Sequence, residues 1–100
     1  MSIMIDSFKT AGELHREGGP SYIEYDGDGD IYIEKYLINE KLHRVGGPAY
    51  TVYYKNGDVY CEQYCIDGML HREDGPAFIR YDEDGEVIGE AYFINGCRIQ

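Results

Sequence analysis

The chain repeats one 28-residue pattern three times, and this period constrains the fold more than any other feature. Each copy begins with Leu-His-Arg, at Leu14-His15-Arg16, Leu42-His43-Arg44 and Leu70-His71-Arg72. Further positions recur in step behind these openers, among them Gly19-Pro20, Gly47-Pro48 and Gly75-Pro76; Tyr25, Tyr53 and Tyr81; Glu34, Glu62 and Glu90; Tyr36, Tyr64 and Tyr92. A fixed period of this size indicates a repeat array, in which each unit covers the apolar face of its neighbour.

Each copy contains two segments with the period-two alternation of a β-strand. The first segments are 21–25, 49–53 and 77–81, and the second are 31–38, 59–66 and 87–94. Gly with Asp or Asn lies between them and supplies the positive φ of a tight hairpin. In each second segment the repeated residues should share one face, as Tyr60, Glu62, Tyr64 and Ile66 do in the middle copy.

We therefore predict an all-β fold, an elongated array of antiparallel β-hairpins in a single twisted sheet. The three 28-residue units are 12–39, 40–67 and 68–95, with an N-terminal cap strand in 1–11 and a partial unit in 96–100. One hundred residues suit a single domain with a modest core. The open edges of such a sheet offer a route to a homodimer.

The charge of the chain limits its partners. The formal net charge is −10, from 19 acidic and 9 basic residues. Direct nucleic-acid binding is not expected, because each neutralised phosphate requires a Lys or Arg. An anionic membrane surface is disfavoured for the same reason, and no apolar run is long enough for a transmembrane helix. A protein partner with a basic surface is favoured.

The N-terminus and the cysteines indicate a cytoplasmic protein. No basic segment followed by an apolar one opens the chain, so no secretory signal is expected, and thiols in the cytoplasm stay reduced. Cys61 and Cys65 are four residues apart, or roughly 13 Å on an extended strand, which is too far for a disulfide. We interpret both as small core residues.

The string LHRxxGPA, the paired short strands and the xxG turns resemble MORN repeats and their variants in bacteriophages and large DNA viruses. The resemblance covers residues 12–98. Such repeats mostly serve as recognition surfaces, so the resemblance implies a non-enzymatic binding protein encoded by a virus. MORN units are shorter and lack the His-Arg opener, and the acidity of this chain argues against the lipid binding suggested for some of them.

We expect no catalytic residue, metal or cofactor. Equivalent His residues of neighbouring units would lie about 9–10 Å apart, whereas zinc ligands lie about 2 Å from the ion. Glu34, Glu62 and Glu90 are identical in every unit, so nothing marks one as acid and another as base, and pairing with Arg or Tyr is expected instead. The acidic run from Asp26 to Asp30 lacks the bidentate Glu of a calcium loop.

The His-Arg pairs have two interpretations. In the first they are structural: each pair fixes the loop leading to Gly-Pro, with His bonded to a backbone carbonyl and Arg paired with the repeated Glu. In the second they form a row of anion-binding sites for a nucleotide signal. The residues concerned are His15, Arg16, His43, Arg44, His71 and Arg72.

Positions that differ between units are the best candidates for recognition. They include Glu24, Val52 and Arg80; Lys35, Gln63 and Ala91; and Asp26, Tyr54 and Asp82. Our candidate binding residues are Asp26, Asp28, Asp30, Tyr54, Asp82, Glu83, Asp84, Glu24 and Arg80. Acidic side chains at strand spacing can mimic a phosphate backbone.

The leading hypothesis is a small viral inhibitor that binds a host defence protein, for example a nuclease complex that binds nucleic acid. The alternatives are a sponge that sequesters a nucleotide signal through the His-Arg loops and a structural or assembly module.

Overall fold

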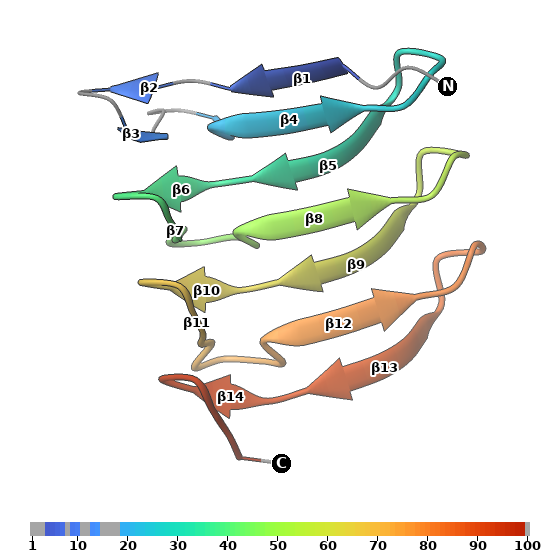
Figure 1. Cartoon of the computed structure of the whole chain (residues 1–100). Coiled ribbons are helices and arrows are strands. Elements are labelled where there is room, and N and C mark those ends of the chain that lie inside the picture. The colour runs from blue at the N-terminus through green and yellow to red at the C-terminus, as the bar shows by residue number, and fades with distance from the viewer. Residues whose placement is uncertain (1–3, 8, 11–12, 15–18, 100) are drawn as a thin grey trace.

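The computed structural model describes residues 4–7, 9–10, 13–14 and 19–99, which contain β-strands and no helix. A seven-stranded antiparallel sheet forms the body of the molecule, in the order β1-β4-β5-β8-β9-β12-β13 (Figure 1). Its strands are β1 (Met4–Ser7), β4 (Tyr22–Tyr25), β5 (Ile31–Lys35), β8 (Tyr50–Tyr53), β9 (Val59–Gln63), β12 (Phe78–Tyr81) and β13 (Val87–Ala91). The predicted all-β class and antiparallel pairing are confirmed.

Four small hairpins lie along one end of this sheet and form separate two-stranded sheets. They pair β2 (Lys9–Thr10) with β3 (Glu13–Leu14), β6 (Leu37–Ile38) with β7 (Lys41–Leu42), β10 (Cys65–Ile66) with β11 (Met69–Leu70), and β14 (Phe93–Ile94) with β15 (Cys97–Arg98). The prediction of a single sheet with unbroken strands at 31–38, 59–66 and 87–94 is therefore wrong.

The break occurs at a repeated tyrosine, and its hydrogen bonds explain it. The Tyr36 N–H still donates to Ala49 O in the neighbouring strand, but Tyr36 O accepts from the His43 N–H within its own hairpin. Tyr64 divides its bonds in the same way, between Ala77 O and the His71 N–H. The chain thus leaves the large sheet at each of these tyrosines.

A β-bulge alters the side-chain alternation near the other end of each long hairpin. Val52 pairs with Cys61, whereas the next residue, Tyr53, pairs with Val59, so Tyr60 is an extra residue in β9. The Tyr60 ring lies 5.1 Å from the guanidinium of Arg80, which is the cross-strand partner of Cys61. The prediction that Tyr60 and Glu62 share a face is wrong, because a bulge places two consecutive residues on the same side.

Cross-strand partners share a face of the sheet, so the pairing defines the two faces. One face, which we call the glutamate face, carries Ile23, Glu34, Thr51, Glu62, Ile79 and Glu90 in succession. The opposite face, which we call the variable face, carries two rows: Glu24, Ile33, Val52, Cys61, Arg80 and Gly89; and Tyr22, Lys35, Tyr50, Gln63, Phe78 and Ala91.

The core of the described residues is small. Its buried members are Ser21, Ile23, Ala49, Thr51, Val52, Cys61, Cys65, Ala77 and Ile79. Burial of both cysteines confirms their interpretation as small core residues, and each remains a free thiol. The molecule measures 38 × 37 × 20 Å, and no described element packs as a second layer on the seven-stranded sheet. Packing therefore relies on close contact between adjacent hairpins.

We predict that Ala77→Leu destabilises the fold, because Ala77 has no exposed surface and the added atoms must displace packed neighbours. Overpacking of this kind costs about 1–3 kcal/mol in the free energy of unfolding, measurable by urea denaturation. Ala91→Leu is the matched control, because Ala91 is only half-buried on the variable face. Equal stability of the two variants would contradict the packing described here.

Candidate functional site

The acidic residues of three hairpin turns lie along one edge of the sheet, where the loops after β4, β8 and β12 project on the same side (Figure 1). We call these turns, residues 26–30, 54–58 and 82–86, the acidic edge. The turns are joined to one another. Lys55 Nζ lies 2.7 Å from Asp28 Oδ2, and Asn56 Nδ2 donates to Glu83 O at 3.2 Å. The acidic edge is therefore a continuous surface.

A polar side chain within each turn holds the backbone of that turn. Asp26 Oδ1 accepts from the backbone N–H groups of Asp28 and Asp30, and Asp82 Oδ1 accepts from those of Asp84 and Glu86. In the middle turn the side-chain oxygen of Asn56 accepts from the Asp58 N–H. Side chains of this type stabilise turns by such local bonds. The remaining acids of the three turns have exposed side chains: Asp28, Asp30, Asp58, Glu83, Asp84 and Glu86.

The negative charges of the acidic edge are not all paired with a cation. The ammonium group of Lys55 lowers the pKa of Asp28 through a hydrogen bond and Coulomb attraction, and both groups are exposed to solvent. Glu83 and Asp84 have no such cation among the described ion pairs. The outer turn around Asp84 is consequently the more negative end of the edge.

The candidate binding residues divide into two groups in the structure. Asp26, Asp28, Asp30, Asp82, Glu83 and Asp84 come together on the acidic edge, as expected. Tyr54 lies with them, but its hydroxyl donates to Tyr81 O at 2.9 Å and its ring packs edge-to-face on Tyr60 at 5.1 Å. Glu24 and Arg80 lie on the variable face, together with Val52.

The His rings connect successive hairpins. His43 Nδ1 accepts from the Asp67 N–H at 3.1 Å, and His71 Nδ1 accepts from the Asn95 N–H at 3.0 Å. The expected bond from His to a carbonyl is therefore wrong, because the ring accepts. The Asp67 carboxylate also lies 3.4 Å from His43 Nδ1. His15 and Arg16 lie outside the described residues.

The Arg side chains are bound within their own loops. The Arg44 guanidinium lies 3.9 Å from the centre of the Tyr36 ring and donates to Pro48 O at 3.2 Å. Arg72 repeats both contacts with Tyr64, at 4.0 Å, and Pro76 O, at 3.1 Å. The expected pairing of Arg with the repeated Glu is wrong, because the glutamates bind tyrosines instead.

A repeated glycine completes each of these stacks. A Cβ atom at Gly47 would lie 2.8 Å from Arg44 Cζ, and one at Gly75 would lie 2.9 Å from Arg72 Cζ. The guanidinium is thus held between an aromatic ring and a bare backbone. The sequence does not reveal this arrangement directly, but it contains a marker: an Arg-x-x-Gly string in every copy, with an aromatic residue eight positions before the Arg (Phe8, Tyr36 and Tyr64).

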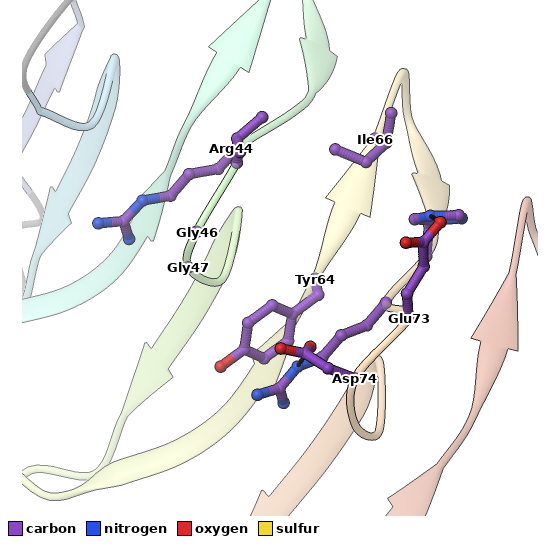
Figure 2. A pocket seen from close by; sticks show the side chains of 10 residues that line it. Arg44, Gly46, Gly47, Tyr64, Ile66, Glu73 and Asp74 are labelled. Atoms are coloured by element: carbon purple, nitrogen blue, oxygen red, sulfur yellow. Dashed lines mark hydrogen bonds and ion pairs between the residues drawn. The ribbon is translucent and has the colours of Figure 1, made fainter.

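A cleft of about 500 Å³ separates the Arg44 loop from the Arg72 loop (Figure 2). Arg44, Gly46 and Gly47 form one side, while Tyr64 and Asp74 lie on the other; Arg72 also lines the cleft. Two carboxylates lie on the second loop: Asp74 lies 3.3 Å from Arg72 Nε and Glu73 lies 3.7 Å from His71 Nε2. An anion entering this cleft would meet carboxylates as well as guanidinium groups.

The repeated glutamates accept hydrogen bonds from tyrosines of the following hairpin. Tyr53 OH donates to Glu34 Oε1 at 2.5 Å, and Tyr81 OH donates to Glu62 Oε1 at 2.6 Å. This confirms the expected pairing with Tyr or Arg for Glu34 and Glu62, whereas no such bond is described for Glu90. Burial and the adjacent carboxylate raise the pKa of Tyr53, and they raise that of Tyr81 to about 12.

The two buried thiols are poor nucleophiles. Burial raises the pKa of Cys65 to about 11, and it also raises the pKa of Cys61. Because the thiolate is the reactive form, both side chains are held in the unreactive state at neutral pH. They contribute packing to the site rather than chemistry.

Within the described ranges, no group of three or more His, Cys, Asp or Glu side chains is arranged to hold a metal ion. The same residues include no helix of the length and apolarity needed to cross a membrane. Comparison of the chain with known protein families, with curated proteins and with solved structures finds no match. The site is therefore interpreted from its own geometry.

We predict that Gly47→Ala displaces the Arg44 guanidinium from its stack and lowers stability by about 1 kcal/mol, the net value of one cation–π contact and one hydrogen bond. Thermal denaturation measures the change. Val45→Ala is the control in the same loop, because Val45 is 83% exposed. The Gly47→Ala penalty should disappear in an Arg44→Ala background, and a penalty that persists there would contradict the stacking explanation.

We also predict loss of stability in alkali. A raised folded pKa favours the protonated tyrosine in the folded state, so the stabilisation is complete below the ordinary value of 10 and is lost as pH rises through about 12 for Tyr81. Urea denaturation between pH 8 and pH 12 tests this, and Tyr53→Phe with Tyr81→Phe should flatten the decline. An unchanged pH profile in that double variant would assign the decline to other groups.

Proposed function

We propose that the chain is a non-enzymatic protein-binding module whose acidic edge contacts a basic surface on its partner. The observation that carries the proposal is the geometry of that edge, where local side-chain bonds hold the backbone of three adjacent turns and the turns leave several carboxylates exposed. An ordered backbone loses little entropy on association, and complementary charge accelerates encounter with a partner and gives specificity.

A more specific form of this proposal is inhibition of a nucleic-acid-binding protein of the host, with the chain encoded by a virus. Equivalent turns are two strands apart, or about 10 Å, so their carboxylates present a row of separated negative charges. Such a row can occupy a basic groove that otherwise binds phosphates. The acidity of the whole chain and the resemblance of its repeats to viral sequences support this form.

We further propose that the chain is an array of 28-residue units. Two kinds of contact recur at that interval: Tyr53 with Glu34 and Tyr81 with Glu62, and His43 with Asp67 and His71 with Asn95. In such an array the repeated residues join the units, and the positions that differ are free to recognise the partner.

The test is affinity capture of the tagged chain from its natural host, followed by binding measurements with the captured protein over a range of salt concentrations. A variant with Asp28→Asn, Asp30→Asn, Glu83→Gln and Asp84→Asn should weaken binding and reduce its salt dependence, since steering charges are lost while Asp26 and Asp82 still hold the turns.

A matched variant with Glu40→Gln, Asp67→Asn, Glu73→Gln and Asp74→Asn removes four acidic charges away from the acidic edge and should bind as the parent does. A DNA duplex should compete with the parent chain for the captured protein. Equal weakening by both charge variants would contradict the acidic edge as the binding surface, and failure of DNA to compete would contradict the mimicry.

The second candidate is a nucleotide sponge, and the cleft between the Arg44 and Arg72 loops favours it. Calorimetry with free nucleotides tests this function directly. Tight binding that is lost in a folded Arg44→Ala, Arg72→Ala variant would replace the protein-binding proposal. The internal bonds of both guanidiniums and the carboxylates of Glu73 and Asp74 argue for the protein-binding function.

A further inference from the structure

The variable face of the sheet is open in the described part of the chain. Every pair of elements with extensive contacts consists of neighbouring strands or of elements in adjacent hairpins, so no described element lies across this face. Its centre is apolar: Ile33 is half-buried, and Val52 and Cys61 on the adjacent strands are already 8% and 6% exposed within one copy, so the accessible part of the face is the rim of side chains around them. Large side chains surround that centre, including Tyr22, Tyr50, Tyr60 and Phe78. Aromatic residues around an apolar centre are typical of protein interfaces.

Two opposite charges on this face, those of Glu24 and Arg80, are placed symmetrically about β8, while Lys35 lies over the Tyr22 and Tyr50 rings. Val52 belongs to β8, Glu24 lies two strands away on one side, and Arg80 lies two strands away on the other. All three belong to one cross-strand row, so they occupy the same level along the strands. Glu24 and Arg80 are therefore about equally distant from Val52, roughly 10 Å in opposite directions, and carry opposite charges.

Neither of these charged groups is neutralised within the described residues. Glu24 accepts the Tyr22 hydroxyl at 2.9 Å, and Arg80 lies over the Tyr60 ring, but no ion pair joins either one to another described side chain. Their separation across the sheet prevents them from pairing with each other inside one chain. They can pair between two chains.

We propose that a second copy of this chain packs on the variable face, related to the first by a two-fold axis that runs parallel to β8 between the two sheets. This rotation places β8 over β8 and β4 over β12. It sets Glu24 of each copy opposite Arg80 of the other, Val52 opposite Val52, and Ile33 opposite Cys61. An isologous interface of this kind is the commonest arrangement of homodimers.

Charge complementarity favours a two-fold axis parallel to the strands over one perpendicular to them. A two-fold axis perpendicular to the strands would set Glu24 opposite Glu24 and Arg80 opposite Arg80, which is repulsive. Two sheets that pack face to face lie about 10 Å apart with their strands nearly aligned, a distance that Glu and Arg side chains span together. The proposed dimer is a two-layer sandwich, which gives the single layer of each copy a second apolar surface.

The size of the face sets the expected strength of association. Seven strands at about 4.8 Å and five residues at about 3.3 Å give a face of roughly 30 by 16 Å. This area lies at the small end of specific interfaces, so the dimer should dissociate on dilution. The dimer does not depend on the protein-binding function proposed above, because the acidic edge lies outside the face.

Sedimentation equilibrium of the parent chain and of charge variants tests the proposal. The parent should show a monomer–dimer equilibrium. Glu24→Arg and Arg80→Glu should each weaken dimerisation by about tenfold or more, because each sets like charges opposite one another. The double variant Glu24→Arg, Arg80→Glu exchanges the two charges and should restore the dimer.

Two controls separate this interface from other causes. Glu73→Arg makes the same charge change on a loop away from the variable face and should leave dimerisation unchanged. Circular dichroism and thermal denaturation of each variant show whether the fold is retained. A parent chain that is monomeric at all concentrations overturns the proposal, and so does a dimer that folded single variants leave intact, since strands pairing at a sheet edge would behave that way. A double variant that stays monomeric rejects the proposed axis.

Discussion

The bonds between successive hairpins are the interactions on which the rest of this structure depends. A hairpin of two short strands is marginally stable in water, and here each one gains side-chain bonds to the next. Glu34 accepts from Tyr53 near the middle of the strands, and His43 accepts from the Asp67 backbone at the curled end. Together with the backbone ladder, these contacts fix both the register and the angle between neighbours, and so position the acidic edge and the variable face.

Residues that recur in every copy and residues that differ between copies therefore have different structural roles. The repeated Tyr, Glu, His and Arg side chains are engaged in internal contacts. The stack of Arg44 on Tyr36 leaves no space for a side chain larger than that of glycine at position 47. Residues that differ between copies, such as Glu24 and Arg80, make contacts that are not repeated in the other copies, with the Tyr22 hydroxyl and the Tyr60 ring respectively. Along each strand, residues that are repeated and join the hairpins thus alternate with residues that differ between copies, and the two kinds lie on opposite faces.

The 28-residue period and the strand alternation were sufficient to predict the strand class, the antiparallel hairpins and the gathering of the acidic turns. They did not predict the break at Tyr36 or the bulge at Tyr60, because both depend on which backbone group bonds across strands. The partners of His43 and Arg44 were also missed. The imidazole of His43 accepts a backbone N–H, and the guanidinium of Arg44 is held against a glycine. Both contacts result from three-dimensional packing, which spacing along one strand does not encode.

The thinness of the molecule has a thermodynamic consequence. With a small set of buried side chains and no described second layer, unfolding a single copy exposes less apolar surface than unfolding a two-layer domain of the same length. The heat-capacity change of unfolding follows that newly exposed apolar area, and it sets the curvature of stability against temperature. A lone copy should therefore have a broader and shallower stability curve than such a two-layer domain.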